Sequence, residues 1–122
     1  MRPHRKLLAW QKAIHFVKEV YQLTKSLPEE EKFGITSQLR RATMSIPLNV
    51  AEGAARQSDK EFVRFLFISE GSSSEVDTLL EICRELGYFS EKKLEPFFIY
   101  NEKISALISG LRKSIERKIQ KT

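Results

Sequence analysis

The chain has 122 residues and carries 21 lysines and arginines against 16 aspartates and glutamates, a formal charge of +5 at pH 7. Hydrophobic residues at 41% and charged residues at 30% are typical of one globular domain and exclude a fibrous, low-complexity or largely disordered chain. The single cysteine, Cys83, excludes an intrachain disulfide, and no apolar stretch reaches the roughly 20 residues of a membrane span. We therefore expect a protein of the reducing cytoplasm.

Positive charge is concentrated near both ends of the chain. Residues 1–6 hold three cations and no acidic residue, a formal charge of +3, and residues 112–122 hold five cations and one glutamate, a charge of +4. Residues 7–111 therefore carry −2. This distribution predicts a localised attraction for polyanions. The alternative is that the basic ends only keep the protein soluble.

The first predicted element is a helix over about residues 7–27. Its apolar positions recur with a period of about 3.6 residues and are Trp10, Ala13, Ile14, Val17, Val20 and Tyr21. Pro28 biases the residue before it away from the helical region, so the helix is expected to end near Leu27.

A second helix is predicted over about residues 35–57, with Thr36 or Ser37 as its N-cap. Pro47 lies inside the pattern and predicts a kink between Thr43 and Pro47, with Asn49 as one candidate donor to the freed carbonyl near Thr43. The polar positions three or four apart on this helix include Arg41, Ser45, Asn49 and Glu52. They predict either a hydrogen-bonded seam that fixes helix packing or a functional polar face.

A third helix is predicted over about residues 59–86. Ser58 and Glu61 have the spacing of a capping box, and Gly87 suits the left-handed conformation that ends many helices. The sequence GSSS at 71–74 is the weak point, because four small, poor helix formers are also compatible with a loop that divides the segment. Residues 62–69 resemble a strand in composition but continue the helical period, so we interpret them as helix.

The last predicted helix spans about residues 91–119, with Ser90 at its start and Pro96 expected to bend or delay its first turns. Short connections between the four segments favour antiparallel neighbours. The sequence therefore predicts an all-α fold, an up-and-down antiparallel four-helix bundle that occupies the chain as a single domain.

Two segments carry more apolar residues than one bundle core requires. Around residues 62–68 and 97–100 the apolar side chains cover most of the helical wheel. The candidates for an interface between copies of the chain are Val63, Phe67, Ile99 and Tyr100. The alternative is that these side chains wrap around a thick core of a monomer.

No pattern typical of a catalytic, metal or cofactor site is present, so we expect no enzyme, no metal and no cofactor. The two histidines do not form a zinc-binding or di-iron pattern, and Gly53 and Gly71 do not form a phosphate-binding loop. One alternative remains open: Glu52, Asp59 and Glu61 are carboxylates that a magnesium-dependent nuclease would need.

The stretch QLRRATMSIPLNVAEGAARQS at 38–58 resembles the signature of the four-helix-bundle proteins encoded by intervening sequences in bacterial 23S rRNA genes. Residues 7–42 and 62–89 resemble the first and third helices of that family. The residues that carry the central motif here are Arg40, Arg41, Ser45, Pro47, Asn49, Glu52 and Gly53. The resemblance implies a homopentameric ring. It also implies a relationship to the accessory variability determinant of diversity-generating retroelements, a basic pentamer thought to bind nucleic acid and a reverse transcriptase.

The leading functional hypothesis is a non-enzymatic oligomeric scaffold that binds RNA or DNA backbones through clustered cations. The candidate contacts are Arg2, Arg5, Lys6, Arg40, Arg41, Arg112, Lys113, Arg117 and Lys118. The alternative is an adaptor that binds a protein, for example a reverse transcriptase, and does not itself bind nucleic acid.

Overall fold

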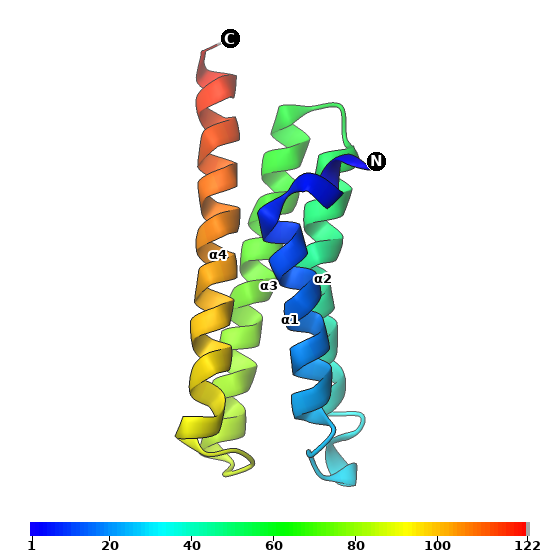
Figure 1. Cartoon of the computed structure of the whole chain (residues 1–122), viewed down its shortest axis with the longest axis vertical. Coiled ribbons are helices and arrows are strands. Elements are labelled where there is room, and N and C mark those ends of the chain that lie inside the picture. The colour runs from blue at the N-terminus through cyan, green and yellow to red at the C-terminus, as the bar shows by residue number, and fades with distance from the viewer. Residues whose placement is uncertain (122) are drawn as a thin grey trace.

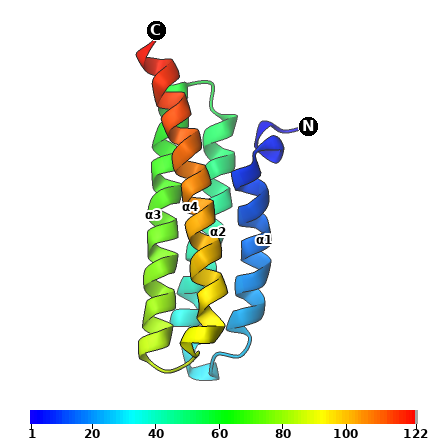
Figure 2. The ribbon, with the colours of Figure 1, turned by 60° about the vertical axis from the view of Figure 1, so that its left-hand side comes forward.

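Four helices form the molecule in the computed structural model, which describes residues 1–121. The helices α1 (Leu8–Thr24), α2 (Ile35–Ala55), α3 (Asp59–Glu85) and α4 (Glu91–Gln120) run alternately up and down (Figures 1 and 2). Two short 3-10 turns, η1 (Pro3–Lys6) and η2 (Glu29–Glu31), precede α1 and α2. Residues 1–121 contain no strand, so the all-α four-helix fold is confirmed, with residues 62–69 inside α3. None of the described helices combines the length and the hydropathy of a membrane span.

Three of the predicted helix boundaries depend on local capping, and all three are confirmed. The Ser58 hydroxyl accepts a hydrogen bond from the Glu61 amide (3.2 Å), and the Ser90 hydroxyl accepts one from the Lys93 amide (3.1 Å). Gly87 follows α3 with a φ of +75°, in the left-handed region that favours glycine. These caps direct the chain from one helix into the next.

The N-cap of α2 and the end of α1 differ from the sequence-based prediction, whereas the start of α2 at Ile35 agrees with it. Gly34, and neither Thr36 nor Ser37, is the N-cap of α2. The reason lies in the preceding turn: the Glu31 carboxylate, at the end of η2 and four residues before Ile35, accepts the hydrogen bond of the Ile35 amide (3.2 Å) that a cap side chain would otherwise take. Helix α1 ends at Thr24, three residues before Leu27.

Neither Pro47 nor the GSSS segment interrupts its helix. α2 continues through Pro47, and Asn49 does not serve Thr43 as expected, because its Nδ2 donates to the carbonyl of Ser45 (2.8 Å). Residues 71–74 lie within continuous α3, so the alternative of a loop there is wrong.

Two buried serines of the GSSS segment, Ser72 and Ser73, bond α3 to both of its neighbouring helices. Ser72 Oγ donates to Ser45 Oγ on α2 (2.8 Å), and Ser73 Oγ donates to Asn101 Oδ1 on α4 (3.0 Å). Asn101 returns a hydrogen bond from Nδ2 to the Ser73 carbonyl (2.9 Å). Polar groups that are costly when buried alone are thereby paired across both seams of α3.

The core lies along the bundle axis and draws side chains from all four helices. Its largest fully buried members are Phe16, Leu39, Ile46, Leu66, Leu80, Leu94, Ile104 and Ile108. Packing is close between α1 and α2, between α2 and α3 and between α3 and α4, and loosest between α1 and α4. Cys83 is fully buried, and burial raises the pKa of its thiol.

Candidate nucleic-acid interface

The two termini and the α2–α3 connection lie at the same end of the bundle (Figures 1 and 2). We call this the basic end and define it as residues 1–6, 52–64 and 112–121. It holds eleven lysines and arginines and four acidic residues, a formal charge of +7, whereas the rest of the described chain carries −2. The fold therefore gathers cations from opposite ends of the sequence onto one end of the molecule.

Three cations of α4 form an exposed row, which we call the α4 stripe: Lys113, Arg117 and Lys121. Their spacing of four residues places them on one face of the helix. Within residues 1–121 none of the three has an acidic partner. Lys118 is also exposed, but its Nζ lies 3.8 Å from Asp59 Oδ2, a surface ion pair of small strength.

The N-terminal cations are held by a turn and are not spread along a free tail. Arg2, Arg5 and Lys6 are exposed on or beside η1, which packs against α1 and α2. The Arg5 carbonyl accepts a hydrogen bond from Gln11 Nε2 (2.8 Å), and the Arg5 guanidinium lies over the Trp10 ring at 5.4 Å. The turn thus fixes the backbone of a second group of cations at the basic end.

Arg112 was expected to contact nucleic acid, but its guanidinium is already engaged within the protein. Nε lies 2.6 Å from Glu70 Oε2, and Nη1 lies 2.7 Å from Glu116 Oε1. The guanidinium also lies 4.2 Å from the centre of the Phe67 ring, and its side chain is only 13% exposed. The hydrogen bonds that Arg112 donates to the Glu70 carboxylate, and secondarily to Glu116, raise the pKa of Arg112 above its ordinary value. This residue therefore joins α3 to α4 and is not a free cation.

Replacing Arg112 by methionine is expected to lower the free energy of unfolding by about 1–3 kcal/mol, because Glu70 is left partly buried without its partner. The control is Lys113→Met, which removes the same charge from an exposed position and should change stability by less than about 0.5 kcal/mol. Urea unfolding followed by circular dichroism measures both. Equal stabilities of the two variants would contradict the structural role of Arg112.

Arg40 is likewise engaged, at the opposite end of the bundle. Its Nε donates to Thr24 Oγ1 (2.8 Å), its Nη2 donates to the Tyr21 carbonyl (3.4 Å), and its guanidinium lies 4.4 Å from the Tyr21 ring centre. It ties α2 to α1. Arg41 is exposed, but it belongs to the N-terminal half of α2 and lines a polar hollow with Gln38 and Glu75, outside the basic end.

The polar stripe of α2 is a packing seam at one of its positions. Asn49 Nδ2 donates to Ser45 Oγ (2.9 Å), and Ser45 is joined to Ser72 of α3. Glu52 does not extend this network toward Arg41, because it pairs with Arg56 one turn away (2.6 Å). The predicted hydrogen-bonded seam between helices is confirmed for Ser45, whereas Asn49 bonds to Ser45 within α2 itself.

Gly53 permits the closest approach of α2 to α3. A Cβ atom at this position would lie 2.9 Å from Phe65 Cβ and 3.3 Å from the Phe62 carbonyl oxygen, well inside normal contact distances. This is a packing requirement, and it explains why the motif that contains Gly53 needs a residue without a side chain.

The carboxylates considered for a nuclease each face a cation. Glu52 pairs with Arg56, Asp59 lies near Lys118, and Glu61 accepts hydrogen bonds from Arg64 (3.0 Å), which lower the pKa of Glu61. Within residues 1–121 no group of three histidine, cysteine, aspartate or glutamate side chains is placed to hold a metal ion.

The four apolar interface candidates do not form one patch. Phe67 is 50% exposed and Ile99 is 49% exposed, whereas Val63 and Tyr100 are partly buried against the core. Phe67 contacts Arg112 of α4. Ile99 lies thirteen residues before Arg112 on the same helix, which is roughly 20 Å along its axis. Phe67 and Ile99 are therefore far apart along the bundle.

A further exposed apolar pair was not expected from the sequence. Leu48 is 66% exposed and Ile68 is 41% exposed. The hydrogen bond between Ser45 and Ser72 aligns the antiparallel helices α2 and α3 at this level. Leu48 lies one turn after Ser45 and Ile68 lies one turn before Ser72. The two apolar side chains are therefore at the same height along the bundle. The α2–α3 face thus offers apolar surface in addition to Phe67 and Ile99.

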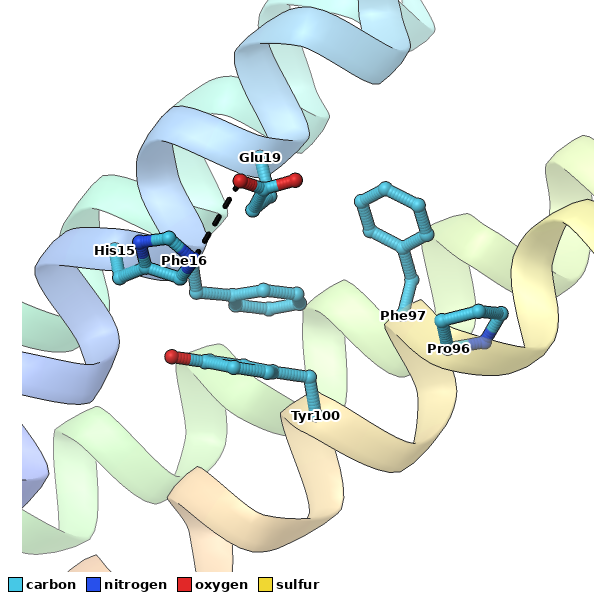
Figure 3. A pocket seen from close by; sticks show the side chains of 6 residues that line it. All are labelled: His15, Phe16, Glu19, Pro96, Phe97 and Tyr100. Carbon is cyan, nitrogen blue, oxygen red and sulfur yellow. Dashed lines mark ion pairs between the residues drawn. The ribbon is translucent and has the colours of Figure 1, made fainter.

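The loosely packed seam between α1 and α4 contains a pocket of about 260 Å³ (Figure 3). The Phe16 and Tyr100 rings stack at 5.2 Å and form its floor, and Phe97 and Pro96 line the α4 side. On the α1 side, His15 Nε2 lies 3.5 Å from Glu19 Oε1. The lining is mainly aromatic and includes no nucleophile hydrogen-bonded to a base.

The basic end could be predicted from the sequence through the predicted topology, although not all of its cations were named. In any up-and-down bundle of four helices, the C-terminus and the second connection return to the end where the chain begins. This brings Arg56, Lys60, Arg64 and Lys121 to the expected cations. The contact of His4 and Arg5 with Trp10 carries no comparable sequence signal.

Comparison with known proteins agrees with this architecture. A family model described as 23S rRNA-intervening sequence protein matches residues 5–110. The crystal structure of a protein of unknown function from the S23 ribosomal protein family of Bacteroides thetaiotaomicron shares the fold, with a TM-score of 0.80 and 24% sequence identity over 87% of this chain and 99% of that one. None of the curated proteins is significantly similar to the chain.

Proposed function

The chain belongs to the 23S rRNA-intervening sequence protein family, and we propose that it acts as a non-enzymatic, oligomeric helical scaffold that binds the phosphate backbone of RNA or DNA. The observation that carries this proposal is the basic end, with a formal charge of +7 against −2 elsewhere in the described chain. Cations grouped in this way release counterions when they neutralise phosphates, which favours binding of nucleic acid irrespective of its sequence.

The residues that would contact phosphate are the exposed cations of the two terminal segments of the basic end, residues 1–6 and 112–121. They are Arg2, Arg5, Lys6, Lys113, Arg117, Lys118 and Lys121. Arg40 and Arg112 do not belong to this set, because both are held by groups of the protein itself. Long exposed side chains reach the backbone without reading base edges, so little sequence preference is expected.

The test is the affinity for a fluorescently labelled structured RNA, measured by anisotropy between about 50 and 300 mM salt. Binding should weaken steeply, and each phosphate contact should contribute about 0.9 to the slope of log affinity against log salt. No binding at the lowest salt would reject the proposal. Salt-insensitive capture of a reverse transcriptase or another protein, without RNA binding, would favour the adaptor function instead.

The scaffold is proposed to be a ring of identical bundles, five in number as the family resemblance implies. Exposed Leu48, Phe67, Ile68 and Ile99 are the apolar surface available for contacts between copies. In a ring whose symmetry axis runs along the bundles, every basic end faces the same side. Five copies at +5 would carry about +25, a strong field for a polyanion.

Light scattering at micromolar concentration measures the assembly directly. The expected mass is about five times the 14.2 kDa of one chain. A mass of a single chain under these conditions would contradict the ring and leave the basic end as the property of a monomer.

A further inference from the structure

Trp10, the single tryptophan in the sequence, follows the N-terminal segment of the basic end, and two side chains of that segment contact its ring. The His4 ring is 4.9 Å from the Trp10 ring, tilted by 55°, and the Arg5 guanidinium lies 5.4 Å from the Trp10 ring centre. We call these three residues the tryptophan cluster. Arg5 is exposed and His4 is partly exposed, whereas Trp10 packs against the core and keeps only part of its surface exposed. The cluster is therefore partly accessible to solvent.

The η1 turn builds the cluster. Leu7 donates its amide hydrogen to the His4 carbonyl (3.0 Å), and Gln11 Nε2 donates to the Arg5 carbonyl (2.8 Å). These bonds hold the N-terminal segment against the start of α1, so that His4 and Arg5, six and five positions before Trp10, reach its ring. Arg2 and Lys6, both exposed, lie in the sequence just before and just after the pair His4 and Arg5.

Attraction to a phosphate backbone requires only cations, and the α4 stripe supplies these without any aromatic neighbour. The tryptophan cluster adds ring faces beside the cations. Proteins bind single-stranded nucleic acid with this combination, because an unpaired base stacks on an aromatic or guanidinium plane while the cations hold the flanking phosphates. A base inside a duplex is already stacked on both faces and has no free face to offer.

We propose that the tryptophan cluster binds an unpaired base of single-stranded nucleic acid. The base stacks against the His4 and Trp10 rings and the Arg5 guanidinium, and Arg2 and Lys6 contact the neighbouring phosphates. This inference rests on the proposed function and narrows it, because the N-terminal part of the basic end then prefers loops and strand ends over continuous duplex.

The single tryptophan makes the test direct, since all tryptophan emission of the native chain comes from Trp10. A single-stranded oligouridine is titrated into the protein at low salt, and a hairpin-free duplex of the same length is titrated separately. The single strand should quench the emission saturably, and the duplex should bind through the cations with little quenching. Single-strand binding without quenching would overturn the inference, whether or not any variant folds.

Substitution gives a second readout, the affinity for labelled strands. Trp10→Leu should bind the single strand about 5- to 150-fold more weakly, the loss that follows removal of one base–aromatic stack. Its affinity for duplex should change by less than about twofold, and Trp10→Phe should retain most single-strand binding. The matched control is Phe33→Leu, which removes an 89% exposed ring beside Lys32 at the opposite end and should change neither affinity.

The outcomes separate the two proposals. If duplex and single strand bind equally and Trp10→Leu binds both as the native chain does, the tryptophan cluster is not a base site while the proposed function stands. If neither strand binds at low salt, both proposals fail together.

Discussion

The double variant Lys113→Glu/Arg117→Glu is expected to bind RNA at least about tenfold more weakly than the native chain at about 0.1 M salt. Both side chains are exposed on the α4 stripe, and neither has an acidic partner within residues 1–121. Their loss should lower the slope of log affinity against log salt by about 2 per chain, since each phosphate contact contributes about 0.9. The reversed charges also repel the backbone.

The control for this variant is Lys92→Glu/Lys93→Glu. Both lysines are exposed in the first turn of α4, at the opposite end of the bundle, where glutamate suits the helix dipole. Each double variant removes two positive charges and adds two negative ones, so the formal charge falls from +5 to +1 in both. Equal losses of affinity would show that net charge alone matters and would contradict a localised interface.

Gly53→Ala is expected to lower the free energy of unfolding by about 1–3 kcal/mol, although alanine is the better helix former. The added Cβ would lie 2.9 Å from Phe65 Cβ and 3.3 Å from the Phe62 carbonyl oxygen. These atoms belong to or adjoin the backbone of α3, so they cannot move aside as the tip of a flexible side chain would. The two helices must separate, and packing beside the new methyl group is lost.

Gly71→Ala and Gly110→Ala are the matched controls, with the opposite expected sign. Both glycines are exposed inside helices, and a Cβ at either position would meet no atom within 4 Å. Alanine should therefore raise the free energy of unfolding by roughly 0.5–1 kcal/mol through helix propensity alone. Urea unfolding of the three variants checks the ranking, and a stabilising effect of Gly53→Ala would contradict the close approach of α2 and α3.

Much of the fold could be predicted because its determinants are local. Helical periodicity, the caps at Ser58 and Ser90 and the left-handed Gly87 depend on neighbours within a few residues. The start of α2 was right, but its N-cap was wrong, because the Glu31 carboxylate in the preceding turn accepts the hydrogen bond of the Ile35 amide. A loop at residues 71–74 was considered because glycine and serine have low helix propensity. Helix propensity does not include the hydrogen bond between Ser73 and Asn101 of α4.

The candidate interface was predictable at the level of segments and less so at the level of residues. Arg112 and Lys113 are adjacent cations of the same basic segment, yet only Arg112 faces Glu70 across α3 and α4. Arg40 and Arg41 differ in the same way, since only Arg40 turns toward Tyr21. Sequence spacing places a side chain on a face of its helix, but the partner on that face comes from tertiary packing.

The prediction of exposed apolar residues was limited in the same way. The helical wheel identifies more apolar residues than one core stripe needs, but it does not say which of them the neighbouring helices cover. Tyr100 is partly covered because it stacks on Phe16, whereas Ile99, its neighbour in sequence, remains half exposed. Leu48 is likewise 66% exposed, although its neighbour in the sequence, Pro47, is buried.

Lysine footprinting of the native chain tests most directly whether the basic end is the nucleic-acid interface. Lysines are acetylated briefly with and without RNA at low salt, and the modified sites are quantified by mass spectrometry. RNA should protect Lys6, Lys113 and Lys121, all exposed at the basic end, and leave Lys25 and Lys93, at the opposite end, unchanged. Equal protection at both ends, or protection of Lys25 and Lys93 alone, would contradict the proposed interface.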